Sequence, residues 1–240
     1  MPNNGSDSPN GDLWRTQPMY TVSEAAHLAG VSPKTIRRWL FGEVPDKRYP
    51  ELKTPPVLGD REVSPYVSFL TLVEIVVAWD FRTVSRVRLD VVREAHSNLS
   101  KETRIEYPFA HIDLETLGGH IVRWIGSNGS SSAQAVDAPH QRSLPGLAER
   151  IRKSAEQRVN ELDYKQKLAS RWYPVGKNVP IVVDPLFSAG LPTIIDRGVT
   201  VDAIRRRWRE DQKIEFIADD LQVDPDLIEQ VLRYADKIAA

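Results

Sequence analysis

Basic side chains are concentrated in one short stretch near the start of the chain, and their types suit contact with nucleic acid. Residues 33–53 carry six basic side chains against three acidic ones, although the net charge of the whole chain is −1. Arginine pairs bidentately with guanine, and lysine and hydroxyl groups bond phosphates or base edges. We therefore predict DNA contacts by Ser32, Lys34, Thr35, Arg37 and Arg38. Three further cations would follow the DNA backbone from a turn-rich wing, namely Lys47, Arg48 and Lys53.

Two helical patterns surround this charge. Thr21 or Ser23 can cap a first helix, and Gly30 suits the left-handed conformation at its end. Ser32 before a proline is a start signal for a second helix. Apolar residues at helical spacing would fix the angle between the helices, namely Ala25, Leu28, Val31, Ile36 and Leu40. The pattern predicts a helix-turn-helix whose second helix enters the major groove. A helical hairpin with a merely solvated basic face is the alternative.

The rest of the chain is predicted to be mostly α with small β elements. Ser64–Pro65 predicts the start of a long apolar helix, and the helical pattern continues through residues 83–100. Residues 104–126 predict one or two short strands, residues 147–169 a helix, and residues 179–185 and 186–198 two more strands. A helix capped by Thr200 follows, with Val201, Ile204 and Trp208 facing inward. Two helices close the chain as a helical C-terminal domain with a short β-hairpin before it.

Composition shifts divide the chain into four parts. Residues 1–18 are rich in Asn, Gly, Ser and Pro and are expected to be a disordered tail. Residues 19–126 form the winged helix-turn-helix with its connecting helices and strands. Residues 127–143 are expected to be a flexible linker, and residues 144–240 a second, helical domain.

The C-terminal stretch repeats the N-terminal plan with opposite charge. In residues 216–234, Ala218, Val223, Pro225 and Ile228 align with Ala26, Val31, Pro33 and Ile36. At the outward positions, however, Asp226 and Glu229 replace Lys34 and Arg37. Carboxylates there would repel phosphates. This copy is therefore expected either to dock a protein or to present a solvated acidic face.

Four arginines lie on the helix before this copy: Arg205, Arg206, Arg207 and Arg209. They could be a solvated face or a second electrostatic patch for DNA. They could also insert into the acidic metal site of a partner nuclease, where guanidinium pairs with carboxylates.

Composition and motifs favour a protein that is not an enzyme. The chain has no cysteine, which excludes thiolate catalysis and Cys-based metal sites. No phosphate-binding loop and no nucleophile elbow is found, and the five histidines lack metal-ligand spacing. No catalytic residue, metal site or cofactor is therefore predicted. No apolar run is long enough for a membrane span, and the N-terminus lacks the pattern of a secretory signal. A cytoplasmic protein is expected.

Residues 20–95, with "AAHLAGVSPKTIRRWL" and "VSFLTLVEIVVAWDFR", resemble the DNA-binding unit of MerR-like winged helix-turn-helix regulators. Residues 182–235, with "VVDPLFSAGLPTI", resemble a small domain common in bacterial antitoxins. Together the two parts resemble the larger VapB-type antitoxins of toxin–antitoxin pairs. The resemblance implies a transcriptional repressor of its own operon that neutralises a VapC-like PIN-domain ribonuclease toxin. A homodimer is expected because operator palindromes require two-fold symmetry. The alternative is a free-standing regulator that responds to a small ligand through its middle region.

Overall fold

The computed structural model describes residues 13–43, 48, 53–59, 63–111, 153, 156–158 and 160–239. The main helices are α1 (Leu13–Thr16), α2 (Val22–Ala29), α3 (Pro33–Phe41), α4 (Phe69–Thr83), α5 (Leu89–Thr103), α8 (Val201–Arg209), α9 (Ile214–Leu221) and α10 (Pro225–Ala239). Short 3-10 turns are η2 (Pro108–Ala110) and η3 (Ser188–Gly190). The strands are β1 (Pro18–Thr21), β2 (Tyr66–Ser68), β3 (Leu162–Lys165), β4 (Leu168–Trp172), β5 (Ile181–Val182), β6 (Thr193–Ile194) and β7 (Val199–Thr200). The molecule is therefore mostly α with small antiparallel sheets, as the sequence predicts.

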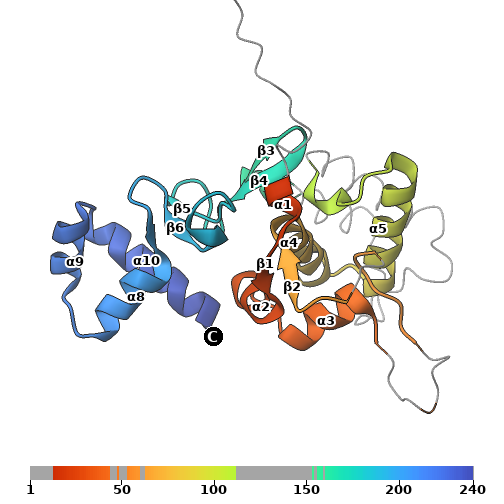
Figure 1. The fold of residues 1–240 in the computed structure, drawn as a ribbon, viewed down its shortest axis with the longest axis horizontal. Helices are drawn as coiled ribbons and strands as arrows, with labels where there is room; N and C mark the ends of the chain where they lie inside the picture. The colour runs from red at the N-terminus through yellow and green to blue at the C-terminus, as the bar shows by residue number, and fades with distance from the viewer. Residues whose placement is uncertain are drawn as a thin grey trace, which may run out of the picture.

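The elements form an elongated molecule with two halves (Figure 1). Helices α1 to α5 make one half and α8 to α10 the other, with the β5–β6 region between them. Strands β1 and β2 pair antiparallel, as do β3 and β4, and β5, β6 and β7 form a three-stranded antiparallel sheet. The expected linker at residues 127–143 lies outside the described residues.

Helices α2 and α3 begin and end where the sequence predicts. Thr21 caps α2 in a capping box with Glu24. Gly30 ends α2 in the left-handed conformation with φ 63°, and the Val31 amide donates back to the Ala26 carbonyl at 3.0 Å. Ser32 then caps α3, with Pro33 at its first position. Local side-chain chemistry therefore fixes both ends of the turn between the two helices.

The long apolar helix differs from its prediction at both ends. It does not begin at Ser64–Pro65, because β2 first pairs with β1 and Ser68 then caps α4. Nor does it continue through residues 83–100, because the chain leaves the helix at Val84 and α5 begins at Leu89. Helix α4 is buried on nearly all sides, so its continuous apolar sequence reflects a central position in the core.

Two apolar cores are present in the described chain. The first core contains residues of α2, α3, α4 and α5 and of the β3–β4 hairpin. The hairpin contributes Leu162, Ala169 and Trp172 to it. The second joins β5 and β6 with α8, α9 and α10. The predicted unit of residues 144–240 is therefore divided between the two cores, and the hairpin belongs to the first.

Part of the predicted helix of residues 147–169 is this hairpin. Residues 153, 156–158 and 160 are helical, but residues 162–165 and 168–172 are paired strands. Gln166 and Lys167 make the turn with φ angles of 52° and 67°. A turn with two left-handed residues normally carries Asn or Gly, so the sequence Gln166–Lys167 does not predict this turn.

The predicted N-terminal tail also contributes to the first half. Residues 13–16 form α1, and Pro18 begins β1. Arg15 is 1% exposed, and its Nη1 donates to the carbonyls of Lys165 and Leu168 at 2.8 and 3.1 Å. These bonds hold the turn of the hairpin against α1. The remainder of the tail, residues 1–12, lies outside the described residues.

Strands were predicted in residues 104–126, and only the beginning of that stretch is described. Residues 108–110 form η2, and His111 pairs with Leu168 in an isolated bridge. A proline and two buried neighbours, Phe109 and Ala110, fill the space beside α4 there. The segment thus covers the core instead of extending a sheet.

The C-terminal half follows the predicted order of two strands and three helices, with one more strand, β7, before α8. Thr200 caps α8, and Val201 and Ile204 are buried as predicted. Trp208, which was predicted to face inward, is 44% exposed. The helix ends one residue later, at Arg209, so Trp208 lies in its last turn.

Helices α9 and α10 repeat the local geometry of α2 and α3. Both first helices have eight residues, and Gln222 occupies the left-handed position of Gly30 with φ 53°. The Val223 amide donates to the Ala218 carbonyl at 3.0 Å, matching the bond of Val31. The alignment of the two stretches made from sequence therefore corresponds to a structural repeat.

In the half of the molecule that contains α3, Gly42 occupies a position that only glycine fits. Its φ and ψ are 73° and −174°, and a Cβ atom would lie 2.4 Å from the Thr54 carbonyl oxygen. Gly30 is also left-handed, but a Cβ there would meet nothing within 4 Å. We expect Gly42→Ala to lower the free energy of unfolding by about 3 kcal/mol, and the matched Gly30→Ala by about 1 kcal/mol. Urea unfolding followed by circular dichroism measures both, and equal losses would contradict this role of Gly42.

Candidate nucleic-acid interface

Helix α3 has one face in the core and one face in solvent. Ile36, Trp39 and Leu40 are 0–2% exposed, and the Trp39 ring packs on Trp79 at 6.0 Å. The opposite face carries Lys34, Arg37 and Arg38, all exposed, and no acidic residue. Trp39 is therefore a core residue, whereas the three cations are available to an external partner.

The C-terminal end of α3 is fixed by the chain that returns to it. The amides of Val57 and Leu58 donate to the Trp39 carbonyl at 2.7 and 3.1 Å, and both side chains are buried. Glu43 and Thr54 exchange backbone hydrogen bonds at 3.0 and 2.7 Å. These contacts join the chain before and after residues 44–53 and hold the C-terminal end of α3 against the core.

Ser32 and Thr35 shape the start of α3. The Ser32 hydroxyl accepts the Thr35 amide at 3.2 Å and lies 2.8 Å from the Thr35 hydroxyl. Ser32 is exposed and Thr35 half-buried. Their hydroxyl groups are thus first of all capping groups, and any external contact would add to that role.

The three cations of α3 differ in their surroundings. Arg38 pairs with Glu43 at 3.2 Å, while its side chain remains 47% exposed. Such surface pairs are weak and exchange readily for another anion. For Lys34 and Arg37, no carboxylate of the described residues lies within ion-pair distance.

The predicted wing cations are only partly described. Lys47 lies outside the described residues, Arg48 is exposed, and Lys53 is exposed beside the Glu43–Thr54 bridge. Arg48 and Lys53 therefore lie on the loop that the bridge closes, on the same half of the molecule as α3.

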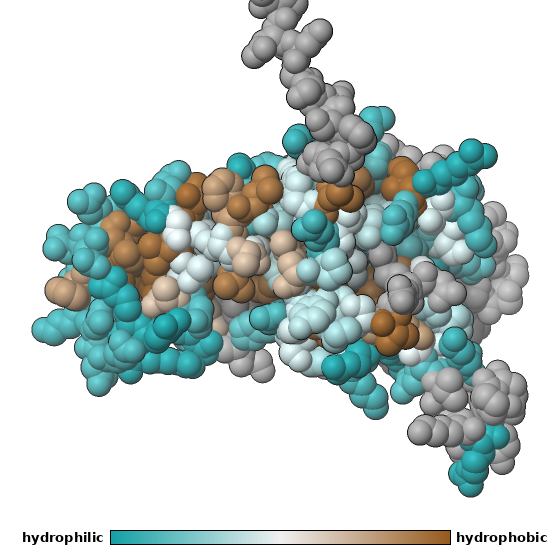
Figure 2. Space-filling view, in the orientation of Figure 1, coloured by the Kyte–Doolittle hydropathy of each residue, from teal (hydrophilic) through white to brown (hydrophobic). Residues whose placement is uncertain are grey.

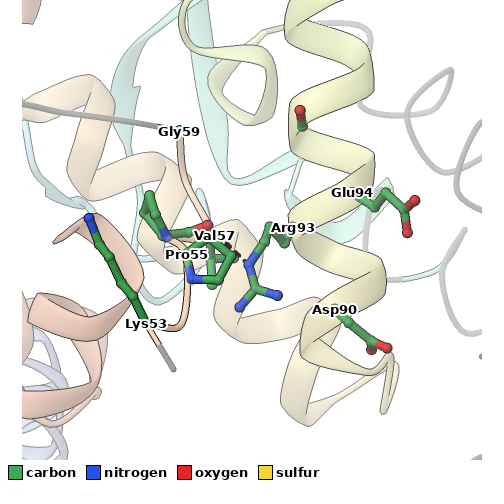
Figure 3. Close-up of a pocket in the computed structure, with 9 residues that line it drawn as sticks. Lys53, Pro55, Val57, Gly59, Asp90, Arg93 and Glu94 are labelled. Atoms are coloured by element: carbon green, nitrogen blue, oxygen red, sulfur yellow. Dashed lines mark hydrogen bonds between the residues drawn. The ribbon is translucent and has the colours of Figure 1, made fainter. Parts of the chain in front are cut away.

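A groove of about 650 Å³ lies between residues 53–59 and α5, and Arg93 reaches across it (Figure 3). Arg93 Nε donates to the Pro56 carbonyl at 3.0 Å. Partial burial lowers the pKa of Arg93, Asp90 opposes this effect, and the charge of Arg38 lowers the pKa further. Asp90 and Glu94 also line the groove, and in Figure 3 their carboxylates point away from residues 53–59. Arg38 therefore repels Arg93, and the nearby carboxylate of Asp90 offsets this repulsion.

Arg93 was not predicted from sequence. It lies 55 residues after Arg38, on a helix that begins only after the chain has crossed the core. The sequence signal is weak, since "VVREAH" reads as an ordinary amphipathic helix. Only the docking of residues 53–59 against α5 brings it beside the predicted cations.

The four arginines of α8 predicted to contact a toxin have different surroundings in the structure. Arg205 faces a cleft toward α2, and its Nε is buried without a described partner. Arg206 pairs with Asp202 at 3.4 Å in the open, and Arg207 is bound to Asp220 and Gln212 at 2.8 Å. Arg209 is exposed at the end of the helix. Successive residues on a helix point 100° apart, so the run spreads around the axis.

The described residues show neither a metal-binding cluster nor a membrane-spanning helix. No group of three or more His, Cys, Asp or Glu side chains there could hold a metal ion. Within the same residues, no helix is long and apolar enough to cross a membrane.

Comparison with known proteins gives the fold and no function. No family model and no curated protein sequence matches the chain. The crystal structure of Rv2018 from Mycobacterium tuberculosis matches with a TM-score of 0.66 and 21% identity, over 90% of this chain and 98% of that one. The two proteins therefore share one fold over nearly their whole length.

The capping role of Ser32 can be separated from any DNA contact. Ser32→Ala is expected to lower the free energy of unfolding by about 1 kcal/mol, because the Thr35 amide loses its acceptor. Ser32→Asp keeps an acceptor and should retain stability. Lys34→Ala, an exposed neighbour, serves as the control and should change it by less than about 0.5 kcal/mol. Urea unfolding that finds Ser32→Ala neutral would contradict the assignment.

Proposed function

We propose that the protein is a sequence-specific DNA-binding regulator that places α3 in the major groove. The observation that carries this proposal is the division of α3 into a fixed, buried face and an exposed face with three cations and no acid. A helix that is fixed against the core holds its side chains in position to read base edges, and exposed cations supply the affinity for phosphates. Helix α2 supports α3 across a three-residue turn, as in a helix-turn-helix.

The loop closed by Glu43 and Thr54 acts as the wing in this proposal. Arg48 and Lys53 follow the DNA backbone on it, and Arg93 adds a contact at its base. The nine-residue α3 reaches only a few base pairs. Two copies related by two-fold symmetry therefore bind a palindromic operator, one half-site each.

The C-terminal half is the protein-docking part of the regulator. Exposed acidic side chains lie on α9 and α10. Figure 2 shows apolar side chains among hydrophilic ones on the surface of this half. The exposed apolar residues are Leu186, Phe187, Leu191, Ile195, Trp208 and Phe216. Apolar area of this kind is typical of protein interfaces, and the acidic charge disfavours DNA.

The partner in this proposal is the one that the resemblance to VapB-type antitoxins implies. In this proposal the C-terminal half neutralises a PIN-domain ribonuclease, and the complex represses its own operon. Arg206 and Arg209 remain able to reach the acidic centre of such a nuclease, because both are exposed. Arg207 contributes to the fold through Asp220 instead.

Removal of the positive charge at position 37 tests the DNA contact. Arg37→Gln should weaken binding to the promoter fragment and reduce the slope of log K against log salt by about 1, because one phosphate or base contact is lost. Arg206→Gln, an exposed arginine of the other half, is the control and should change neither. Fluorescence anisotropy across a salt series measures both quantities. Unchanged affinity and slope for Arg37→Gln would exclude this face.

The pair of Arg38 and Glu43 allows a test in the opposite direction. Glu43→Gln should tighten DNA binding severalfold, because Arg38 loses its competing carboxylate while the backbone bridge to Thr54 remains. The gain should shrink at high salt. Weaker binding of this variant at low salt would mean that Arg38 does not face the DNA.

The antitoxin role is tested with the full chain, because the first core contains the β3–β4 hairpin and a cut near residue 144 would divide it. Coexpression with the neighbouring reading frame should give a complex that lacks ribonuclease activity. The double variant Arg206→Glu, Arg209→Glu should release activity, whereas Arg37→Glu should not. If no complex forms, or if Arg37→Glu alone releases activity, the assignment of the halves fails.

A further inference from the structure

A cleft of about 450 Å³ lies between the two halves of the molecule, outside the proposed DNA face. One wall is α2, and the other is formed by α8, the end of α10 and residues 191–192. Figure 1 shows the C-terminal end of α10 approaching α2 at this place. The volume falls in the range of small-molecule sites in proteins, about 300–1,000 Å³.

The charged side chains that line the cleft are Glu24, Asp202 and Arg205, and among them Arg205 has a buried nitrogen without a hydrogen-bond partner in the described residues. Glu24 belongs to the capping box and accepts the Thr21 amide at 2.7 Å, and Asp202 pairs with Arg206 at 3.4 Å. Arg205 forms no hydrogen bond or ion pair with the residues that the structure describes, and its Nε is shielded from solvent. A buried guanidinium nitrogen without an acceptor is costly, so the site favours an added anion.

His27 lies on the same wall as Glu24 and responds to this charge. Burial lowers the pKa of His27, the nearby Arg205 lowers it further, and Asp202 partly opposes the effect. The ring is therefore held toward its neutral form. It does not supply a second positive charge and can offer either a donor or an acceptor to a ligand.

Most of the remaining lining is apolar, and Ser23 and Thr200 add two hydroxyl groups. Leu28, Pro192, Val201 and Ala235 are buried or nearly so, while Leu191 is 39% exposed at the rim. A ligand that filled this space would place carbon against these side chains and its charged group at Arg205. Pure inorganic ions would leave the apolar wall uncovered.

We propose that this cleft binds a small organic anion, a carboxylate or phosphate ester carried on an apolar or aromatic body. Arg205 holds the anionic group, and Leu28, Pro192 and Val201 contact the body. Because the walls come from both cores, the bound molecule also fastens the C-terminal half to α2. The site stands independently of the proposed DNA contacts, since none of the α3 cations lines it.

Benzoate and phenyl phosphate are suitable probes, with benzamide as the neutral counterpart and inorganic phosphate as the anion without a body. NMR titration of the full chain should show saturable shifts of the methyl groups of Leu28 and Val201 with at least one of the two aromatic anions. Benzamide and inorganic phosphate should each bind at least about tenfold more weakly, since each lacks one of the two contacts. Which aromatic anion binds more tightly distinguishes carboxylate from phosphate chemistry.

Two variants locate the anion. Arg205→Met should abolish the binding of the preferred anion, whereas Arg209→Met, at the exposed end of α8 and outside the cleft, should leave it unchanged. The bound anion should also raise the pKa of His27, because it offsets the charge of Arg205. A comparison of the methyl spectra of the two variants without ligand shows that the fold is kept.

Three results would overturn the site. They are the absence of saturable shifts with both aromatic anions, binding of benzamide as tight as theirs, and a loss of binding in Arg209→Met equal to that in Arg205→Met. Loss of DNA binding in an α3 variant has no bearing on this outcome, so failure of the cleft and failure of the DNA face are distinguishable.

Discussion

The structure depends on the burial of one face of α3. Ile36, Trp39 and Leu40 are removed from water between α2, α4 and the returning chain, and Trp39 contributes its carbonyl as well as its ring. Burial of large side chains is the main favourable term in folding, and a helix so held cannot rotate. The positions left outward are therefore set by the positions that must be inward. Three of them are cations, and this is why the first half presents a basic face.

The second half shows the same backbone arrangement with a different surface. Gln222 adopts the left-handed conformation that Gly30 adopts in the first copy, and Val223 repeats the bond of Val31. The apolar positions and the proline are also kept, but Asp226 and Glu229 stand where Lys34 and Arg37 do. The inward residues determine the hairpin, and the outward ones are free to determine its partner. The opposite charges of the two copies thus agree with two different partners without any difference in fold.

Local signals in the sequence predicted the local structure well. Thr21, Gly30, Ser32 and Thr200 act where capping chemistry places them, because these effects depend on neighbours within four residues. The errors concern distant partners. The Gln166–Lys167 turn lacks its usual residues, and α1 is ordered by carbonyls about 150 residues away. Likewise Arg93 meets residues 53–59, and Arg205 meets α2, only after the chain has folded. For the candidate sites, the sequence therefore identified the cations of α3 but not the groove or the cleft.

The absence of cysteine in the chain permits a direct measurement of which helix meets DNA. Arg37→Cys and Glu229→Cys place single thiols at matched outward positions of α3 and α10, and each can carry an azidophenacyl photo-crosslinker. With the promoter fragment upstream of its own reading frame, the account predicts cross-linking from position 37, competed by unlabelled promoter, and none above background from position 229. Cross-linking from position 229 alone, or equally from both, would contradict it.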